Sequence, residues 1–497
     1  MNYNIETGTI ASLISLPVCN RVINCDVSED INIPEGLPDV RRVLALKENI
    51  LSPAKFIGAK SVDMSGAVDY SVIYLGADGN IYSAPFSAEY SFSLPLENTD
   101  ANESVSVICS LCGESGNVRI STPRRLQVRA GIRASAVCFG RALCDEALDG
   151  VEDDSAVQRL ELDGENAFFD CESSDIVTLT DEYLLAEGDR IIYSDASVFI
   201  NDVRVDGEVV RASGEAVVKL LLQNGDNIET VLRKLPFDAE TDLDELDLGD
   251  EAVLCRAFGS VNKLDVSVED GRAQIELGIV LEVCMAQNRA IRYTRDMYST
   301  KQTCKAEYKR TSLPVALFNK NVNITQSERM SVSDIDFPEG AEILDVWGSA
   351  FCEGGALENR RYVLRGKVKY KMICRRDGDV SVCDAELPFK YEAELGELDV
   401  AGACADIKVM GARVRCDGEN LLIESELAIS ASAYGLTELD ILSKATFGEA
   451  VEQRKNQFVV CFKGSDESAF DLAKRYCVPF SQISDDTQKD SFVIIER

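Results

Sequence analysis

Cysteine is the residue type with the most chemical potential in this chain, which has 17 cysteines and no histidine. Cys109 and Cys112 form a CxxC motif, the spacing of a redox-active or zinc-binding pair. The lack of histidine removes Ser-His-Asp and Cys-His catalysis, Cys/His zinc sites and imidazole acid-base chemistry. An odd number of cysteines scattered along a long chain is typical of reduced thiols and not of a disulfide framework.

Carboxylates are too abundant to single out a catalytic pair. The chain has 85 Asp+Glu against 51 Lys+Arg, which gives a formal net charge of -34. No GxxxxGK[ST] motif is present to bind phosphate. We therefore predict no catalytic residue, no cofactor and no metal site, and we disfavour a carboxylate-based hydrolase.

Charge and hydropathy also limit the partners and the compartment. The negative charge argues against nucleic acid or an anionic membrane as the principal partner, because phosphate attraction needs clustered cations. The first residues lack a basic stretch followed by an apolar core, and no run of about 18 apolar residues occurs. Since 45% of the residues are hydrophobic, we expect folded domains in a soluble, cytoplasmic protein with no membrane insertion.

The chain repeats itself. "DINIPEG" at Asp30 to Gly36 returns as "DIDFPEG" at Asp334 to Gly340. Further on, Gly66, Gly214 and Gly366 each interrupt an alternating apolar segment and lie 148 and 152 residues apart. A length of 497 residues favours three or four domains. We infer three copies of one domain.

Each copy has the pattern of β-structure. In the third copy, apolar residues from Tyr362 to Cys374 alternate with basic ones, the period of a half-buried strand. Asx-Gly or Gly-Asx turns follow at Gly79, Gly225 and Gly378 and favour tight hairpins. The fold predicted is mainly β, with three repeated antiparallel β-sandwich or barrel-like domains. Their boundaries are 17–140, 165–290 and 315–436.

The second half of each copy aligns through Gly113, Gly259 and Gly411. In this alignment Cys109 matches Cys255 and Ile407, and Cys112 matches Phe258 and Met410. Because the matched residues are apolar, core packing is a better interpretation of the CxxC motif than redox or metal chemistry.

The last residues, 456–497, follow another pattern. A short strand from Phe458 to Phe462 precedes Ser465 and Asp466, which are placed to cap a helix. On that helix, one face carries apolar residues at spacings of three and four: Phe470, Ala473, Tyr476 and Cys477. Pro479 breaks the helix and can start a short helical turn, and "SFVIIE" closes the segment as a strand. The prediction is a small β-α-α-β module.

These residues carry two resemblances. The terminal segment, with "DLAKRYCVP" on its helix and "VII" near its end, resembles a LysM module. The three copies, with "PEG" and "PDVRRVL" between Pro34 and Leu44 and "RDMYST" at Arg295 to Thr300, resemble the SPOCS domain of spore-forming Firmicutes. Together they are similar to spore-coat morphogenesis proteins of the SipL and SpoVID type.

The resemblance implies a function. It implies a non-enzymatic scaffold in the mother-cell cytoplasm, at the forespore surface, which links a coat-basement ATPase to other spore coat morphogenetic proteins. The LysM-like module is then the part that contacts the ATPase. The alternative is a protein that binds peptidoglycan or cortex glycan through this module. The Gly-Asp-Thr turn that would favour glycan binding is absent, since Ser465, Asp466 and Glu467 follow Gly464.

The predicted partner-binding residues are the polar turn, the helix cations and the start of the following segment. They are Lys463, Gly464, Ser465, Asp466, Glu467, Lys474, Arg475 and Pro479. Loops and helix faces on a rigid frame commonly carry recognition.

Two other features have two interpretations each, and a third has one. The basic row from Arg365 to Arg376 (Arg365, Lys367, Lys369, Lys371, Arg375 and Arg376) is either a surface for an acidic partner or a solvated sheet face, and we favour the latter. Trp347 is better interpreted as a core or edge residue than as a sugar platform. The basic connector from Arg289 to Arg310 can neutralise the acidic connector at 144–154.

Overall fold

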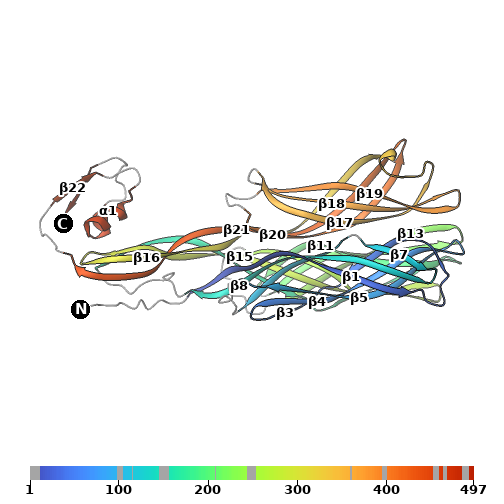
Figure 1. Cartoon of the computed structure of the whole chain (residues 1–497), viewed down its shortest axis with the longest axis horizontal. Helices are drawn as coiled ribbons and strands as arrows, with labels where there is room; N and C mark the ends of the chain where they lie inside the picture. The colour runs from blue at the N-terminus through green and yellow to red at the C-terminus, as the bar shows by residue number, and fades with distance from the viewer. Residues whose placement is uncertain are drawn as a thin grey trace.

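The computed structural model describes residues 12–97, 104–114, 116–144, 156–207, 209–242, 253–358, 361–394, 400–451, 458–462, 467–483 and 492–496. The described chain is mainly β, and all its strand pairs are antiparallel (Figure 1). Among these residues no helix has the length and apolar character needed to cross a membrane.

Three sheets are antiparallel meanders around a central strand. They are β2 (Val40–Ile50), β4 (Ser61–Gly76) and β5 (Ile81–Pro95), with β3 (Ala54–Ile57) on β4; β11 (Arg190–Asp206), β12 (Val209–Asn224) and β13 (Asn227–Asp242); and β17 (Glu342–Glu358), β18 (Arg361–Arg376) and β19 (Asp379–Glu394). The glycines predicted in the turns, Gly79, Gly225 and Gly378, all have positive φ. A side chain there would be strained, which is why these turns need glycine.

The spaced glycines lie in the central strand of each meander, under an aromatic ring. Gly66 pairs with Tyr90, Gly214 with Phe237, and Gly366 with Phe389 on the next strand. A Cβ on Gly366 would lie 2.2 Å from the carbonyl oxygen of Phe351 and 2.5 Å from the Phe389 ring. The ring covers the bare backbone, so the glycine of one strand and the aromatic residue of the next form one packing unit.

The other three large sheets are built around a long central strand. They are β1 (Ser12–Asn32), β8 (Arg125–Cys144) and β6 (Val105–Gly113), with β7 (Asn117–Thr122) on β8; β10 (Val177–Leu184), β15 (Arg272–Ser299) and β14 (Val253–Glu269), with β9 (Val157–Ser173) on β15; and β16 (Gln302–Ser331), β21 (Asn420–Ala450) and β20 (Gly402–Asp417). A single 3₁₀ turn, η1 (Val332–Asp334), follows β16.

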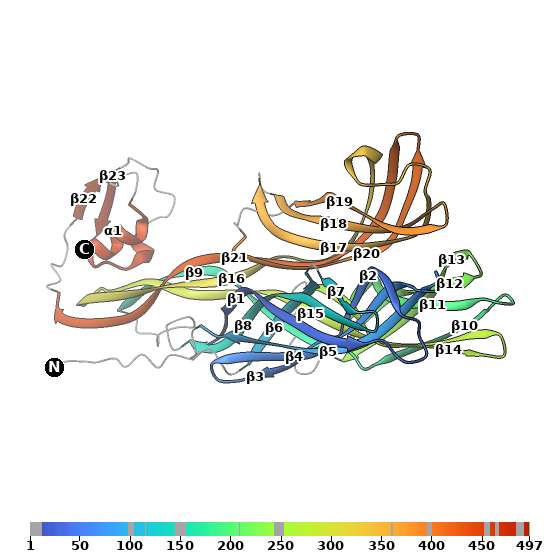
Figure 2. The same ribbon diagram turned by 45° about the vertical axis from the view of Figure 1, so that its right-hand side comes forward.

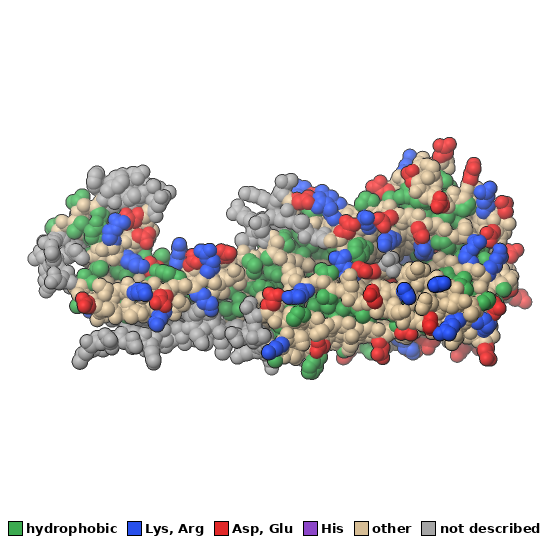
Figure 3. Space-filling model, in the orientation of Figure 1, with side chains coloured by type: hydrophobic (Ala, Val, Ile, Leu, Met, Phe, Trp, Pro, Cys, Tyr) green, Lys and Arg blue, Asp and Glu red, His purple; other side chains and the backbone are tan. Residues whose placement is uncertain are grey.

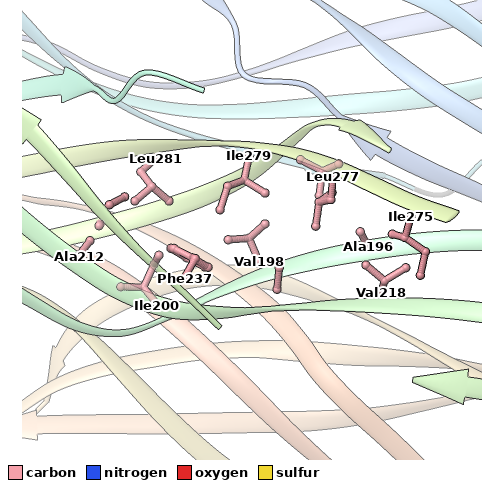
Figure 4. Packing of buried hydrophobic residues seen from close by; sticks show 14 of the residues in the cluster. Ala196, Val198, Ile200, Ala212, Val218, Phe237, Ile275, Leu277, Ile279 and Leu281 are labelled. Atoms are coloured by element: carbon pink, nitrogen blue, oxygen red, sulfur yellow. The ribbon is translucent and has the colours of Figure 1, made fainter. Parts of the chain in front are cut away.

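Each meander packs on one of these long-strand sheets and shares a hydrophobic core with it. In Figure 4, Ile275, Leu277, Ile279 and Leu281 of β15 face residues of β11, β12 and β13. A corresponding core lies between the sheet of β1 and β8 and the meander of β2, β4 and β5. Another lies between the sheet of β16 and β21 and the meander of β17, β18 and β19. We call these three bodies the first, second and third units.

The units meet through matching positions. Ile73, Leu221 and Ile373 each lie seven residues after the covered glycine, and all three are buried in one cluster shared by the units. At a second cluster, Phe139 stacks on Phe169 with ring centroids 3.8 Å apart, and Tyr434 packs edge-on. Because each cluster takes side chains from all three units, the units form one body around an approximate threefold arrangement.

Strands of the second and third units continue beyond this body as a stalk (Figure 2). The predicted connector from Arg289 to Arg310 is itself mostly strand, at the end of β15 and the start of β16. β15 pairs with β9 here, and β16 pairs with the end of β21. The two ribbons pack face to face through Tyr293, Leu313 and Leu439. Of the acidic connector at 144–154, residues 145–154 lie outside the described residues.

Candidate functional site

The terminal module lies at the far end of the stalk (Figure 1). β22 (Phe458–Phe462) and β23 (Phe492–Glu496) form a two-stranded antiparallel sheet. The helix α1 (Ala469–Tyr476) and a 3₁₀ turn, η2 (Phe480–Gln482), come between them in sequence. The second helical element is therefore a single 3₁₀ turn that starts after Pro479, the residue expected to break the helix.

The helix cap differs from the prediction. Ser465 and Asp466 lie outside the described residues, and the N-cap is Ser468. The Ser468 hydroxyl accepts the Asp471 backbone N–H at 3.1 Å, and the Ser468 N–H donates to the Asp471 carboxylate at 3.0 Å. This reciprocal pair satisfies two backbone donors that the helix leaves unpaired, so the cap of α1 lies two to three residues later than predicted.

The core of the module is largely on the predicted helix face. Phe470 and Ala473 are buried as expected, together with Leu472, which the face analysis omitted. Tyr476 is only half-buried, and Cys477 ends the helix with a left-handed backbone, φ 52°. The sheet contributes Cys461 and Ile495.

The stalk completes this core. Tyr298 of β15 is 3% exposed and lies edge-on to Phe470, with ring centroids 5.1 Å apart. Its hydroxyl donates to the Val478 carbonyl at 2.6 Å. The Phe480 backbone N–H donates to Oε1 of Gln158, on β9, at 3.0 Å. The module is thus seated on the stalk through a shared aromatic core and backbone hydrogen bonds.

An ion pair fixes the same seat. The Lys474 ammonium lies 2.6 Å from Asp296 of β15, and the Tyr308 hydroxyl donates to the same carboxylate at 2.7 Å. Burial disfavours a charged lysine, but the hydrogen bond and charge of Asp296 outweigh it and raise the pKa of Lys474. The "RDMYST" segment therefore provides both the anion and the aromatic ring that hold the module.

The predicted partner-binding residues have different environments. Lys463, Gly464, Ser465 and Asp466 lie outside the described residues. Glu467 is paired with Arg475, which stays the more exposed of the two. Lys474 is engaged by the stalk, and half-buried Pro479 is the N-cap of η2. Of the described candidates, Arg475 has the most exposed side chain.

A different surface of the module was missed from the sequence. Phe458 and Val460 of β22 are 69% and 62% exposed. They alternate with Val459 and Cys461, which contribute to the module core. The alternation is visible in the sequence "FVVCF", and two exposed apolar side chains on one strand face make this face a candidate contact surface.

Charged residues are buried where the three units meet, and they pair across unit boundaries. Arg256 of β14 lies 3.3 Å from Asp406 of β20, and both side chains are nearly inaccessible. Arg256 also donates to the hydroxyl and the carbonyl of Ser430. Similar pairs join Lys55 to Glu282 at 2.7 Å and Lys219 to Asp345 at 2.6 Å. Since each partner comes from a different unit, these pairs specify how the units fit together.

The CxxC motif does not form a chelating pair. Cys109 and Cys112 are three residues apart on strand β6, so their side chains lie on opposite faces. Burial raises the pKa of both thiols, to about 12 for Cys112. The packing interpretation agrees with this geometry, because Cys109 packs against the core of the first unit.

The other two ambiguous features are also structural. On the basic row, Lys367 pairs with Glu386 and Lys371 with Asp384 on the next strand, both at 2.8 Å. Figure 3 shows that acidic and basic side chains are interspersed over the visible face. Trp347 is 5% exposed and packs edge-on against Tyr193 at the unit junction, so it is a core residue.

Comparison with known proteins gives no relative for this chain. No protein-family model matches it, and neither a curated protein nor a solved structure does.

Proposed function

We propose that this chain is a non-enzymatic scaffold of spore-coat assembly. In this proposal the three units are SPOCS-like domains, and the terminal LysM-like module captures a coat-basement ATPase at the forespore surface, in the mother-cell cytoplasm. The observation that carries the proposal is the position of the module at the tip of the stalk, away from the body (Figure 2). A module held there can bind one partner while the body binds others.

The surface that best suits this contact is the exposed face of β22. Phe458 and Val460 point away from the module core and leave the seat on the stalk intact. Lys474, in contrast, is engaged by Asp296. A partner that contacts Phe458 and Val460 needs no rearrangement of the module, so this face takes precedence over the helix cations.

The construction of the body supports a scaffold role. Three units share two hydrophobic clusters and several buried ion pairs, and this gives a rigid frame with separate outer surfaces. Several modest contacts on one frame increase the total affinity through their effective concentration.

The test is capture of partners from a sporulating-cell lysate, with bound proteins identified by mass spectrometry. We expect the full chain to retain a coat-basement ATPase and a chain ending at Val451 to lose it. Phe458→Ser with Val460→Ser should also lose it. Phe56→Ser, which alters an equally exposed aromatic residue on the body, should keep it.

Sedimentation with purified peptidoglycan distinguishes the alternative. If the full chain sediments with glycan through its module and captures no ATPase, the scaffold proposal is wrong and glycan binding replaces it. Capture of the ATPase by the truncated chain would also contradict the role proposed for the module.

A further inference from the structure

The thiols that the fold brings together are distant in sequence. Cys171 of β9 lies directly opposite Cys284 of β15, and Cys19 of β1 lies directly opposite Cys138 of β8. Directly opposed residues of antiparallel strands have Cα atoms about 4.5–5.5 Å apart. A disulfide needs about 4.4–6.8 Å. Both pairs therefore have a Cα spacing within the range of a disulfide.

The two thiols of each pair influence each other, because each changes the pKa of the other: Cys171 with Cys284, and Cys19 with Cys138. In the first pair, Cys284 is buried in the cluster shared by the three units, and Cys171 packs against that cluster. In the second pair, both cysteines are buried in the core of the first unit.

A third contact provides a geometric contrast. Cys374 of β18 and Cys383 of β19 also influence each other's pKa, but they are not opposite each other. Cys374 pairs with Ser381, and Cys383 pairs with Met372. Diagonal neighbours of this kind have Cα atoms about 7–8 Å apart, beyond the usual range of a disulfide.

The surroundings favour the thiolate form of one member of each opposed pair. The hydrogen bond from Cys171 and the Arg256 guanidinium lower the pKa of Cys284, although burial opposes them. The pKa of Cys171 is raised because Cys171 is the donor to Cys284 and because it is buried. The hydrogen bond from Cys138 similarly lowers the pKa of Cys19. Among the described residues, none accepts a hydrogen bond from Nε of Arg256.

We propose that Cys171–Cys284 and Cys19–Cys138 are oxidation sites, at which a small peroxide closes a cross-strand disulfide. The Cys284 thiolate attacks one oxygen of hydrogen peroxide, so that an S–O bond forms and the O–O bond breaks to release hydroxide. Cys171 then loses its proton, and its sulfur attacks the sulfur of the resulting sulfenic acid. An S–S bond forms as the S–O bond breaks and a second hydroxide leaves. The two thiol protons convert both hydroxides to water.

The balance of the reaction is two thiols and one peroxide giving one disulfide and two waters. Two electrons pass from the sulfurs to the peroxide oxygens. Cys19 and Cys138 react in the same way, with Cys19 as the nucleophile. The Cys171–Cys284 bond fastens β9 to β15 where the stalk leaves the body, and the inference does not depend on the proposed function.

The test treats the reduced full chain with hydrogen peroxide, blocks the remaining thiols and maps its peptides without reduction. We expect linked peptides that contain Cys171 with Cys284 and Cys19 with Cys138, each two hydrogen atoms lighter than the sum of its thiol peptides. Cys374 with Cys383 and Cys109 with Cys112 should remain unlinked. Exposed Cys416 shows whether the oxidant reached the protein.

A single variant tests the order of the steps. In Cys171→Ser the sulfenic acid on Cys284 has no resolving thiol, so dimedone should label Cys284. Cys374→Ser is the matched control and should leave both disulfides unchanged. If peroxide oxidises Cys416 but links neither opposed pair, or links the diagonal pair first, the proposal is overturned. The mapping uses the unaltered chain, so the result does not depend on whether a variant folds.

Discussion

The Lys474 ammonium and the Asp296 carboxylate lie 2.6 Å apart and join the last helix of the chain to a strand 178 residues earlier. The Asp296 side chain is 15% exposed and that of Lys474 is 32% exposed. A partner that binds Lys474 must first displace the stalk. The contact therefore holds the module in place and also keeps Lys474 from being available to a partner.

Loss of either charge should loosen the module. Asp296→Asn or Lys474→Met should destabilise its seat by about 1–2 kcal/mol, since a half-buried charge loses its partner while solvent still screens the site. Hydrogen exchange of the Ala469–Tyr476 amides would report this as faster exchange. The double exchange, Asp296→Lys with Lys474→Asp, should restore part of the protection. No change in any variant would show that the ion pair has no role in seating.

Tyr298 should matter more than the ion pair. Tyr298→Phe should cost about 1 kcal/mol because the Val478 carbonyl loses its donor. Tyr298→Ala should cost about 3–5 kcal/mol because it empties an aromatic position in the module core. Protease sensitivity of the module, compared with that of the body, measures both effects. Phe56→Ala, at a 71% exposed position, should have little effect.

Two glycines in strands of the third unit should respond oppositely to alanine. Gly366→Ala should lower the free energy of unfolding by about 1–3 kcal/mol, because the new methyl group meets the Phe351 carbonyl and the Phe389 ring. Gly411→Ala meets nothing within 4 Å and should be neutral or stabilising by about 0.5–1 kcal/mol. Denaturant unfolding of the two variants checks this. Equal effects would contradict the packing role of the covered glycine.

Buried thiols should make the fold sensitive to alkaline pH. Burial raises the pKa of Cys112, Cys255 and Cys374 from the ordinary value of 9.0 to about 12. The unfolded chain then loses these protons at lower pH than the folded chain. Their contribution is fully present below pH 9 and is lost as the pH rises from 9 towards 12, by about 1.4 kcal/mol per thiol for each pH unit.

Two buried lysines act in the opposite direction. Burial lowers the pKa of Lys47 and Lys408 to about 8, so they add stability as the pH rises from 8 to 10.5. Because the three thiols outnumber the two lysines, the free energy of unfolding, measured in the presence of reductant, should fall between pH 9 and pH 10.5. Denaturant unfolding across this range should show a shallower fall when Cys112, Cys255 and Cys374 are replaced by alanine. An unchanged slope would show that these thiols do not govern the effect.

Local patterns in the sequence predicted local structure correctly. Alternation identified the strands, and the turn glycines have the positive φ they were expected to need. The capping residue was misplaced because a Ser-Asp pair precedes α1. The reciprocal pattern of Ser468 and Asp471 was the more specific signal in the sequence, since it satisfies both residues' backbone donors.

Relations between distant segments could not be predicted from these patterns. The sequence alignment matched Gly113, Gly259 and Gly411 with one another. In the structure they pair with Ile132, Leu281 and Glu426 on the next strand. These partners lie six, eight and five residues after the buried residues that start the three apolar rows, Leu126, Ala273 and Leu421, so the strand registers differ. Strand register depends on bulges, which shift the pairing by one residue and leave the alternation almost unchanged. Contacts such as Arg256–Asp406 depend on how whole units pack, and no period within one segment encodes that.

The stalk also has a mechanical consequence. β21 runs from the third unit to the tip and pairs with β16 along its whole length, from Asn420 to Ala450. A pull on the terminal module along this axis loads many backbone hydrogen bonds together in shear, so that none can break alone. The ribbon that positions the module is therefore built as a tether that resists tension.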